Sequence, residues 1–269
     1  MLPKFLYHYN AISSDLGRRA DRKLKQRLEE TLLDDALYFA PPIGFNDPFD
    51  CHYIPELTEQ CFKELSSHRP LERFVSVKRN KLLHTLNRDL QQLRSSFDHR
   101  SACEQLRDYI RANYGILCLS EHKDSIPMFA YYAGGHSGFC LEFALKPTED
   151  EAFFNQVQKV QYTTQFPTLA FEHRSHKEIL ALMLATKCKV WQHEREWRII
   201  KTPDELPKNR KLKFPQHLLT GIILGCSIAE ADKGFIKQLL QKRKQRLKLI
   251  QAKPAWGQYA IDVSQEIDY

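Results

Sequence analysis

The chain has 269 residues, of which 42% are hydrophobic and 11% aromatic, and its formal net charge is +7. This composition excludes a disordered chain and predicts a packed core, while the basic balance favours contact with nucleic acid or phosphate-bearing ligands. No apolar run approaches the roughly 18 residues of a membrane span, and the N-terminus does not resemble a secretory signal. The seven cysteines form no CxxC pair. We therefore expect a cytoplasmic protein with reduced thiols and no membrane contact.

The first 50 residues predict two short strands, one helix and a structured loop. Residues 4–9 (KFLYHY) have the aromatic and leucine content of a strand. Apolar side chains then recur at steps of four from Leu16 to Leu32, which predicts an amphipathic helix. A second strand at 37–40 leads into PPIGFNDPFD (41–50), where prolines, a glycine and an Asn-Asp-Pro sequence predict a loop.

Residues 57–112 are strongly polar and have helical spacing, and they contain no glycine. We interpret this block as a helical insertion within one domain that spans 1–269.

The pattern changes after residue 113. Apolar or alternating runs predict strands that outnumber the helices and do not alternate with them regularly, which favours the α+β class. The expected strands are at 114–121, 137–145, 157–163, 196–201, 220–225, 246–252 and 258–263, and the expected helices at 126–133, 168–187 and 229–246.

The segment WQHEREWRII (191–200) holds the leading candidates for chemistry. Glu194 and Glu196 are two residues apart, a spacing that places both carboxylates on one face of a strand. Two like charges on one face repel. They therefore serve either to stabilise a cationic transition state or to form ion pairs with Arg195, Arg198 or a neighbouring strand.

Three further segments offer weaker candidates. His8 lies between two tyrosines and could donate a hydrogen bond into a cleft, or it could be an ordinary polar residue of an edge strand. Tyr131 and Tyr132 precede a diglycine, where an aromatic face could stack on a flat ring or simply pack in the core. Asn46 and Asp47 precede a proline and predict a rigid turn that could shape a ligand loop. No metal-ligand spacing stands out, so no metal site is expected.

In this order, LYHY, LYFAPPIGFNDPFD, CLSE, MFAYYAGGHSGFCLEF, WQHEREWRII and GIILG resemble the bacterial domain-of-unknown-function 2971 family. The order of the motifs is in turn similar to that of ADP-ribosyltransferases of the histidine–tyrosine–glutamate type. That resemblance implies a split mixed or antiparallel β core carrying the helical insertion. It also implies NAD as a substrate.

The resemblance assigns roles to individual residues. His8 would hold the adenosine ribose of NAD, Tyr131 or Tyr132 would stack on nicotinamide, and Glu196 would bond the nicotinamide ribose. Glu194 would help the acceptor, which would be a protein or a nucleic acid. The implied activity is an ADP-ribosyltransferase or an NAD glycohydrolase, in the role of a toxin or phage-defence effector.

Two alternatives come from the residues themselves. The charge of +7 and the basic stretch 237–248 favour a non-catalytic nucleic-acid-binding module. Acidic residues such as Asp47, Glu142 and Glu196 could instead hold Mg²⁺ in a nuclease.

Overall fold

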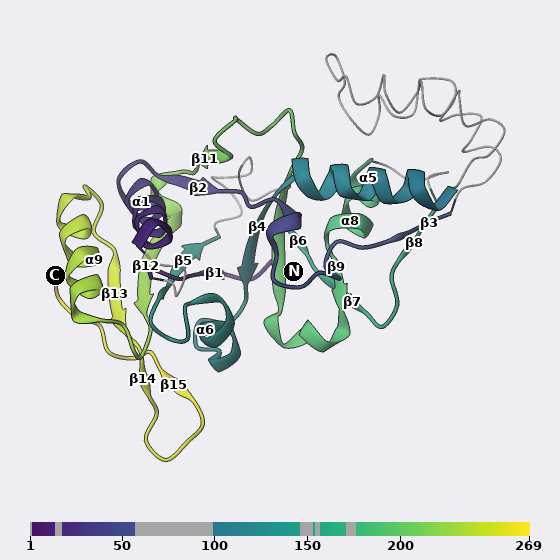
Figure 1. The fold of residues 1–269 in the computed structure, drawn as a ribbon. Coiled ribbons are helices and arrows are strands. Elements are labelled where there is room, and N and C mark those ends of the chain that lie inside the picture. The colour runs from purple at the N-terminus through teal and green to yellow at the C-terminus, as the bar shows by residue number, and fades with distance from the viewer. Residues whose placement is uncertain (1, 14–17, 57–98, 146–152, 154–156, 171–175) are drawn as a thin grey trace.

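A computed structural model describes residues 2–13, 18–56, 99–145, 153, 157–170 and 176–269 (Figure 1). Its centre is a seven-stranded sheet in which β12 and β13 pair in parallel and all other neighbours pair antiparallel. This mostly antiparallel arrangement confirms the α+β class. In sheet order the strands are β13 (Lys248–Gln251), β12 (Leu219–Leu224), β5 (Phe139–Ala144), β1 (Phe5–Asn10), β4 (Gly115–Ser120), β10 (Glu196–Lys201) and β6 (Val157–Lys159).

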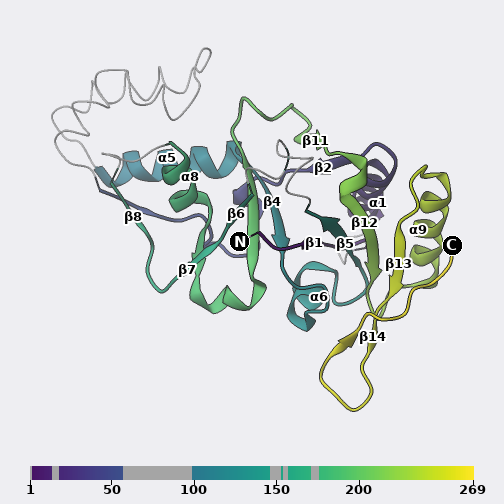
Figure 2. The same cartoon turned by 180° about the vertical axis from the view of Figure 1, so that it is seen from behind.

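The remaining elements surround this sheet, as the two opposite views show (Figures 1 and 2). The helices are α1 (Arg18–Leu33), α5 (His99–Asn113), α6 (Ile126–Tyr132), α8 (His176–Leu184) and α9 (Glu230–Lys242), with short 3-10 segments η1 (Pro42–Gly44), η3 (Lys189–Glu194) and η4 (Gln216–Leu218). Four two-stranded pairs complete the described part: β2 (Ala36–Tyr38) with β11 (Lys211–Lys213), β3 (Ile54–Glu56) with β8 (Thr168–Ala170), β7 (Gln161–Thr163) with β9 (Thr186–Cys188), and β14 (Lys253–Pro254) with β15 (Ile261–Asp262).

The two faces of the sheet are covered by different helices because side chains alternate along each strand. Leu117 and Leu141 pack on one face together with Leu28 of α1 and Leu239 of α9. On the other face, Tyr7 packs with α6, while residues of β4 and β10 pack with α5 and α8. Since α6 and the loop after β2 meet on this second face, it carries the candidate site. His8 alternates with Tyr7 and therefore starts from the first face, although it also lines the cavity of the site.

Helix α6 is fixed at both ends by local signals. The hydroxyl of Ser125 accepts a hydrogen bond from the backbone N–H of Met128, and the helix is followed by Gly134 and Gly135 at φ of +57° and +62°. A side chain at either glycine would be strained by this left-handed backbone. The expected short helix that ends in a diglycine is confirmed. It brings Tyr131 and Tyr132 to the end of the sheet.

Two expected elements are wrong. The strand predicted over 157–163 is divided into β6 and β7, which belong to different sheets. We predicted a single helix over 168–187, whereas among its described residues Thr168–Ala170 form β8, His176–Leu184 form α8 and Thr186–Cys188 form β9. β8 pairs with β3, and β9 pairs with β7. These hydrogen bonds to strands distant in sequence outweigh the local preference for a helix. As a result Lys187 lies in a strand.

Of the predicted insertion at 57–112, residues 57–98 lie outside the described part, and residues 99–112 lie within α5. Within the described residues, no helix combines the length and the apolar content that a membrane span needs.

Candidate active site: a cavity beside a buried ion-pair network

The central strands β1 and β4 separate beside His8. Their described register is the single pair Tyr7–Ser120, and further along β4 the backbone of Ile116 bonds to Ala40 instead, with N···O distances of 2.8 and 3.0 Å. The ring of His8 reaches across, with Nδ1 2.8 Å from the carbonyl oxygen of Cys118.

The protonation state of His8 follows from this contact. A carbonyl oxygen only accepts, so Nδ1 carries the hydrogen. Burial lowers the pKa of His8 against the opposing effect of this hydrogen bond. The ring is therefore neutral, and its Nε2 is an acceptor.

A cavity of about 310 Å³ lies next to this separation. It is large enough for part of a small-molecule ligand. Six of the seven residues that the sequence singled out line it: His8, Asn46, Tyr131, Tyr132, Glu194 and Glu196. They come from β1, the loop after η1, α6, η3 and β10. The seventh, Asp47, lines a neighbouring cavity, and its carboxylate accepts the backbone N–H of Phe49 at 2.9 Å in the turn that the sequence predicted.

Glu194 and Glu196 meet in a way that the sequence did not predict. The expectation that they share one strand face is wrong, because Glu194 ends η3 and Glu196 begins β10. Arg195 between them has a left-handed backbone with φ of 42°. Both carboxylates nevertheless converge on the ammonium of Lys187, with Nζ···O distances of 2.5 and 3.2 Å.

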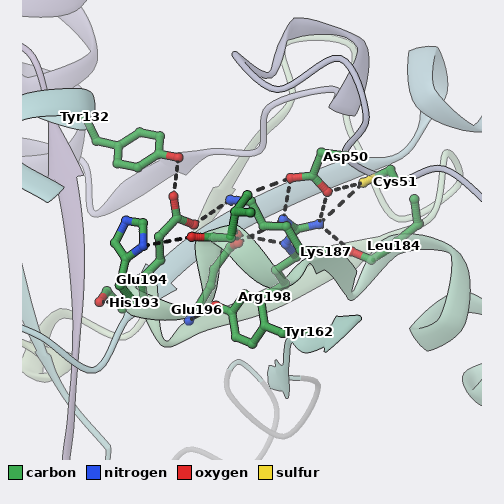
Figure 3. Close-up of polar contacts among 12 residues, drawn as sticks. Asp50, Cys51, Tyr132, Tyr162, Leu184, Lys187, His193, Glu194, Glu196 and Arg198 are labelled. Carbon is green, nitrogen blue, oxygen red and sulfur yellow. Dashed lines mark hydrogen bonds and ion pairs between the residues drawn. The ribbon is translucent and has the colours of Figure 1, made fainter. Parts of the chain in front are cut away.

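Arg198 extends these contacts into a buried network (Figure 3). Its fully buried guanidinium donates to both carboxylate oxygens of Glu196, at 2.8 and 2.9 Å, and to both of Asp50, at 2.9 and 2.7 Å. Lys187 also lies 3.8 Å from Asp50. Ion pairing of the two glutamates, one of the two readings of the sequence, is therefore present. Its partners are Arg198 and Lys187, whereas Arg195 is exposed and lies 3.8 Å from Glu121.

The two glutamates differ in their acidity. Burial opposes ionisation of both, but Arg198 and Lys187 together lower the pKa of Glu196 to about 2. For Glu194, burial and the nearby Glu196 outweigh the attraction of Lys187, so its pKa is raised. With all three carboxylates ionised, Asp50, Glu194 and Glu196 carry one more charge than the two cations neutralise. Because its pKa is raised while that of Glu196 is lowered, Glu194 takes up a proton more readily than Glu196 does.

The two adjacent tyrosines have separate environments. The hydroxyl of Tyr132 donates to Oε1 of Glu194 at 2.6 Å, which ties this ring to the network. Tyr131 is 60% exposed, and its ring packs edge-on against Trp191 at a centroid distance of 5.9 Å. Tyr131 is thus the more exposed of the two tyrosine rings that line the cavity.

Sequence reasoning missed several residues that hold the site. Lys187 and Asp50 complete the charge network, Ser120 donates to the backbone carbonyl of Glu194 at 2.6 Å, and the hydroxyl of Tyr162 accepts the backbone N–H of Glu196 at 2.8 Å. Two signals were available. Asp50 ends the motif FNDPFD, and Lys187 is a lone charge after the apolar run 179–185. A charge in such a context is buried only when it is paired.

Of the residues named for a nuclease, Glu196 lies in the buried network and Asp47 lies in the turn after η1. Among the described residues, no group of three His, Cys, Asp or Glu side chains is arranged to hold a metal. Glu142, proposed as one of three metal ligands, bonds instead with Tyr7 and Thr220. In the basic stretch 237–248, Arg243 pairs with Asp35 at 2.7 Å and so serves the fold.

One comparison with known proteins supports the resemblance to the domain-of-unknown-function 2971 family. Searches of curated proteins and of solved structures found no match. Residues 128–199, which include both tyrosines, Lys187 and both glutamates, match the model of one family, described as Protein of unknown function (DUF2971). Over residues 128–199, the chain is thus similar to this DUF2971 family.

Proposed function

We propose that the protein is an NAD-dependent ADP-ribosyltransferase or NAD glycohydrolase. One observation carries the proposal. Residues between positions 8 and 196, chosen from the order of sequence motifs, line a single cavity. An enzyme of the histidine–tyrosine–glutamate type requires these residues to lie around one cavity. Because they are far apart in the sequence, only the fold can bring them together.

The cavity offers groups suited to the two ends of the scissile bond. The exposed ring of Tyr131 can stack on nicotinamide. The neutral ring of His8 can accept a hydrogen bond from a ribose hydroxyl. Breaking the bond between C1′ and nicotinamide leaves the electron pair on a neutral base and a cationic, oxocarbenium-like sugar. The excess negative charge of the network would stabilise that cation.

Because the two carboxylates differ in pKa, they suit different catalytic roles. Glu196, with a pKa of about 2, stays ionised at any physiological pH and supplies a fixed charge near C1′. Glu194 has a raised pKa, which suits a general base. When an acceptor O–H or N–H, or water, attacks C1′, the new bond forms to the sugar and the released proton passes to Glu194.

The test is turnover of labelled NAD in the presence of protein, RNA and DNA acceptors. Wild-type protein is expected to release nicotinamide and either transfer or free the ADP-ribose. Glu196→Gln and Glu194→Gln are each expected to lower turnover by at least about a hundredfold. Glu230→Gln, which changes an exposed carboxylate at the start of α9, is the matched control and should turn over normally. Intact NAD with every acceptor, at full folding by circular dichroism, would refute the proposal.

A further inference from the structure

A second and larger cavity adjoins the first one. It encloses about 830 Å³ and shares Asn46 and Lys187 with the first cavity. Trp191 joins the two, because its ring lies 5.3 Å from the ammonium of Lys187 and packs edge-on against Tyr131. A group bound in the second cavity would therefore lie next to the carboxylates of the first.

The wall of this second cavity is aromatic. Phe49, His52, Phe166 and Trp191 line it. Phe49 is 64% exposed and Phe166 is 42% exposed, while His52 and Phe166 pack with their ring centroids 5.3 Å apart. Large aromatic rings exposed together around a hollow are typical of a ligand site, and their flat faces favour a flat ligand.

The same wall carries polar groups that a purely apolar ligand would leave unused. Thr186 is 5% exposed, and its hydroxyl has no hydrogen-bond partner among the residues that the structure describes. Buried hydroxyls are ordinarily paired, so this one calls for a partner. Gln165 and Asn46 add amide groups to the lining. A ring with donors and acceptors on its edge matches this set.

Positive charge lies at the same cavity. Lys187 lines it, and Arg111 of α5 donates to Nε2 of His52 at 3.0 Å. Burial and Arg111 lower the pKa of His52, so its ring is neutral and remains able to stack. Lys187 is already paired with its three carboxylates, so Arg111 and the net charge of +7 are the features that favour a ligand carrying phosphate.

We propose that this second cavity binds a nucleobase of a single-stranded nucleic acid, which is the acceptor of the ADP-ribose. The base would stack on the aromatic wall, as in single-strand-binding proteins, and its edge would bond with Thr186 and the amides. The role of this nucleic acid as the acceptor of ADP-ribose rests on the proposed function. The binding of a nucleobase in the second cavity does not depend on the transferase activity.

The test measures oligonucleotide binding and NAD binding separately. Labelled single-stranded RNA and DNA are titrated by fluorescence anisotropy, and NAD by calorimetry. Phe166→Ala is expected to weaken oligonucleotide binding about tenfold, as loss of one stacking contact does. Thr186→Val should weaken it about threefold. Neither should change the affinity for NAD. The matched control is Tyr259→Ala, which removes a fully exposed aromatic ring outside both cavities and should bind as wild type.

Each other outcome is decisive. Absence of oligonucleotide binding, or equal losses in Phe166→Ala and the control, overturns the nucleobase site. An equal loss of NAD affinity in Phe166→Ala would mean that the cavity holds the adenine of NAD, which overturns the acceptor assignment. The acceptor assignment is also overturned if the protein binds no oligonucleotide but transfers ADP-ribose to a protein acceptor, and Phe166→Ala slows that transfer. If NAD is neither bound nor consumed while oligonucleotides bind through Phe166, the transferase fails and the nucleobase site stands.

Discussion

Removing the charge of Lys187 is the sharpest test of the buried network. Its ammonium lies within 4 Å of three carboxylates, at 2.5 Å from Glu194, 3.2 Å from Glu196 and 3.8 Å from Asp50. Methionine has nearly the same length and no charge. In Lys187→Met, Arg198 alone would face three buried carboxylates.

The expected cost is large because the carboxylates that would lose their partner are themselves buried. Lys187 and its three acidic partners are all nearly fully buried. Breaking such a pair from one side costs about 3–5 kcal/mol. At about 2–4 °C per kcal/mol for a chain of this size, the melting temperature should fall by about 6–20 °C.

The loss should also depend on pH. The pKa of Glu194 is already raised in the wild type and would rise further without Lys187. A raised native pKa means that the folded protein binds the proton more readily than the unfolded chain, so stability increases as pH falls through that pKa. The deficit of Lys187→Met should therefore be smaller at pH 5 than at pH 8.

The assay is denaturant unfolding of wild type and Lys187→Met at both pH values. Lys189→Met is the control, because Lys189 is exposed two residues away and its loss should cost no more than about 0.5 kcal/mol. Adding Glu194→Gln to Lys187→Met should restore part of the stability. If Lys187→Met is as stable as the control at pH 8, then Lys187 does not stabilise the fold by neutralising the buried carboxylates.

Four further predictions concern single residues. Glu196→Gln should cost about 3 kcal/mol or more in urea unfolding, whereas Glu194→Gln, which replaces a carboxylate that resists ionisation, should cost no more than about 1 kcal/mol; equal costs would contradict their opposite pKa shifts. Tyr131→Ala should weaken NAD binding measured by calorimetry while leaving the melting temperature unchanged, because the ring is exposed. Thr186→Val should leave the free energy of unfolding unchanged or raise it slightly, since its hydroxyl has no partner among the described residues; a loss above about 1 kcal/mol would reveal one. His8 has a lowered pKa, so its contribution to stability falls as pH drops below about 6.5, and His8→Gln should flatten that part of the unfolding pH profile.

The sequence by itself determined the features that depend on local pattern. Alternating apolar residues at 137–145 and the continuous run at 114–121 predicted the strands β5 and β4, and the diglycine after 126–133 marked the end of a short helix. The order of the motifs led to the family whose model residues 128–199 match and to six of the residues around one cavity. These inferences succeed because periodicity, caps and motif order are carried by neighbours in the chain.

Tertiary structure alone decided how Glu194 and Glu196 are used. Their spacing suggested one strand face, but a left-handed Arg195 separates a 3-10 segment from a strand, and Lys187 draws both carboxylates together. Lys187 reaches that position only because β9 pairs with β7, a contact that turns an apparently helical segment into a strand. The acidity of each glutamate then follows from which cations lie beside it and from its burial. Those quantities depend on residues distant in sequence and have no local signature.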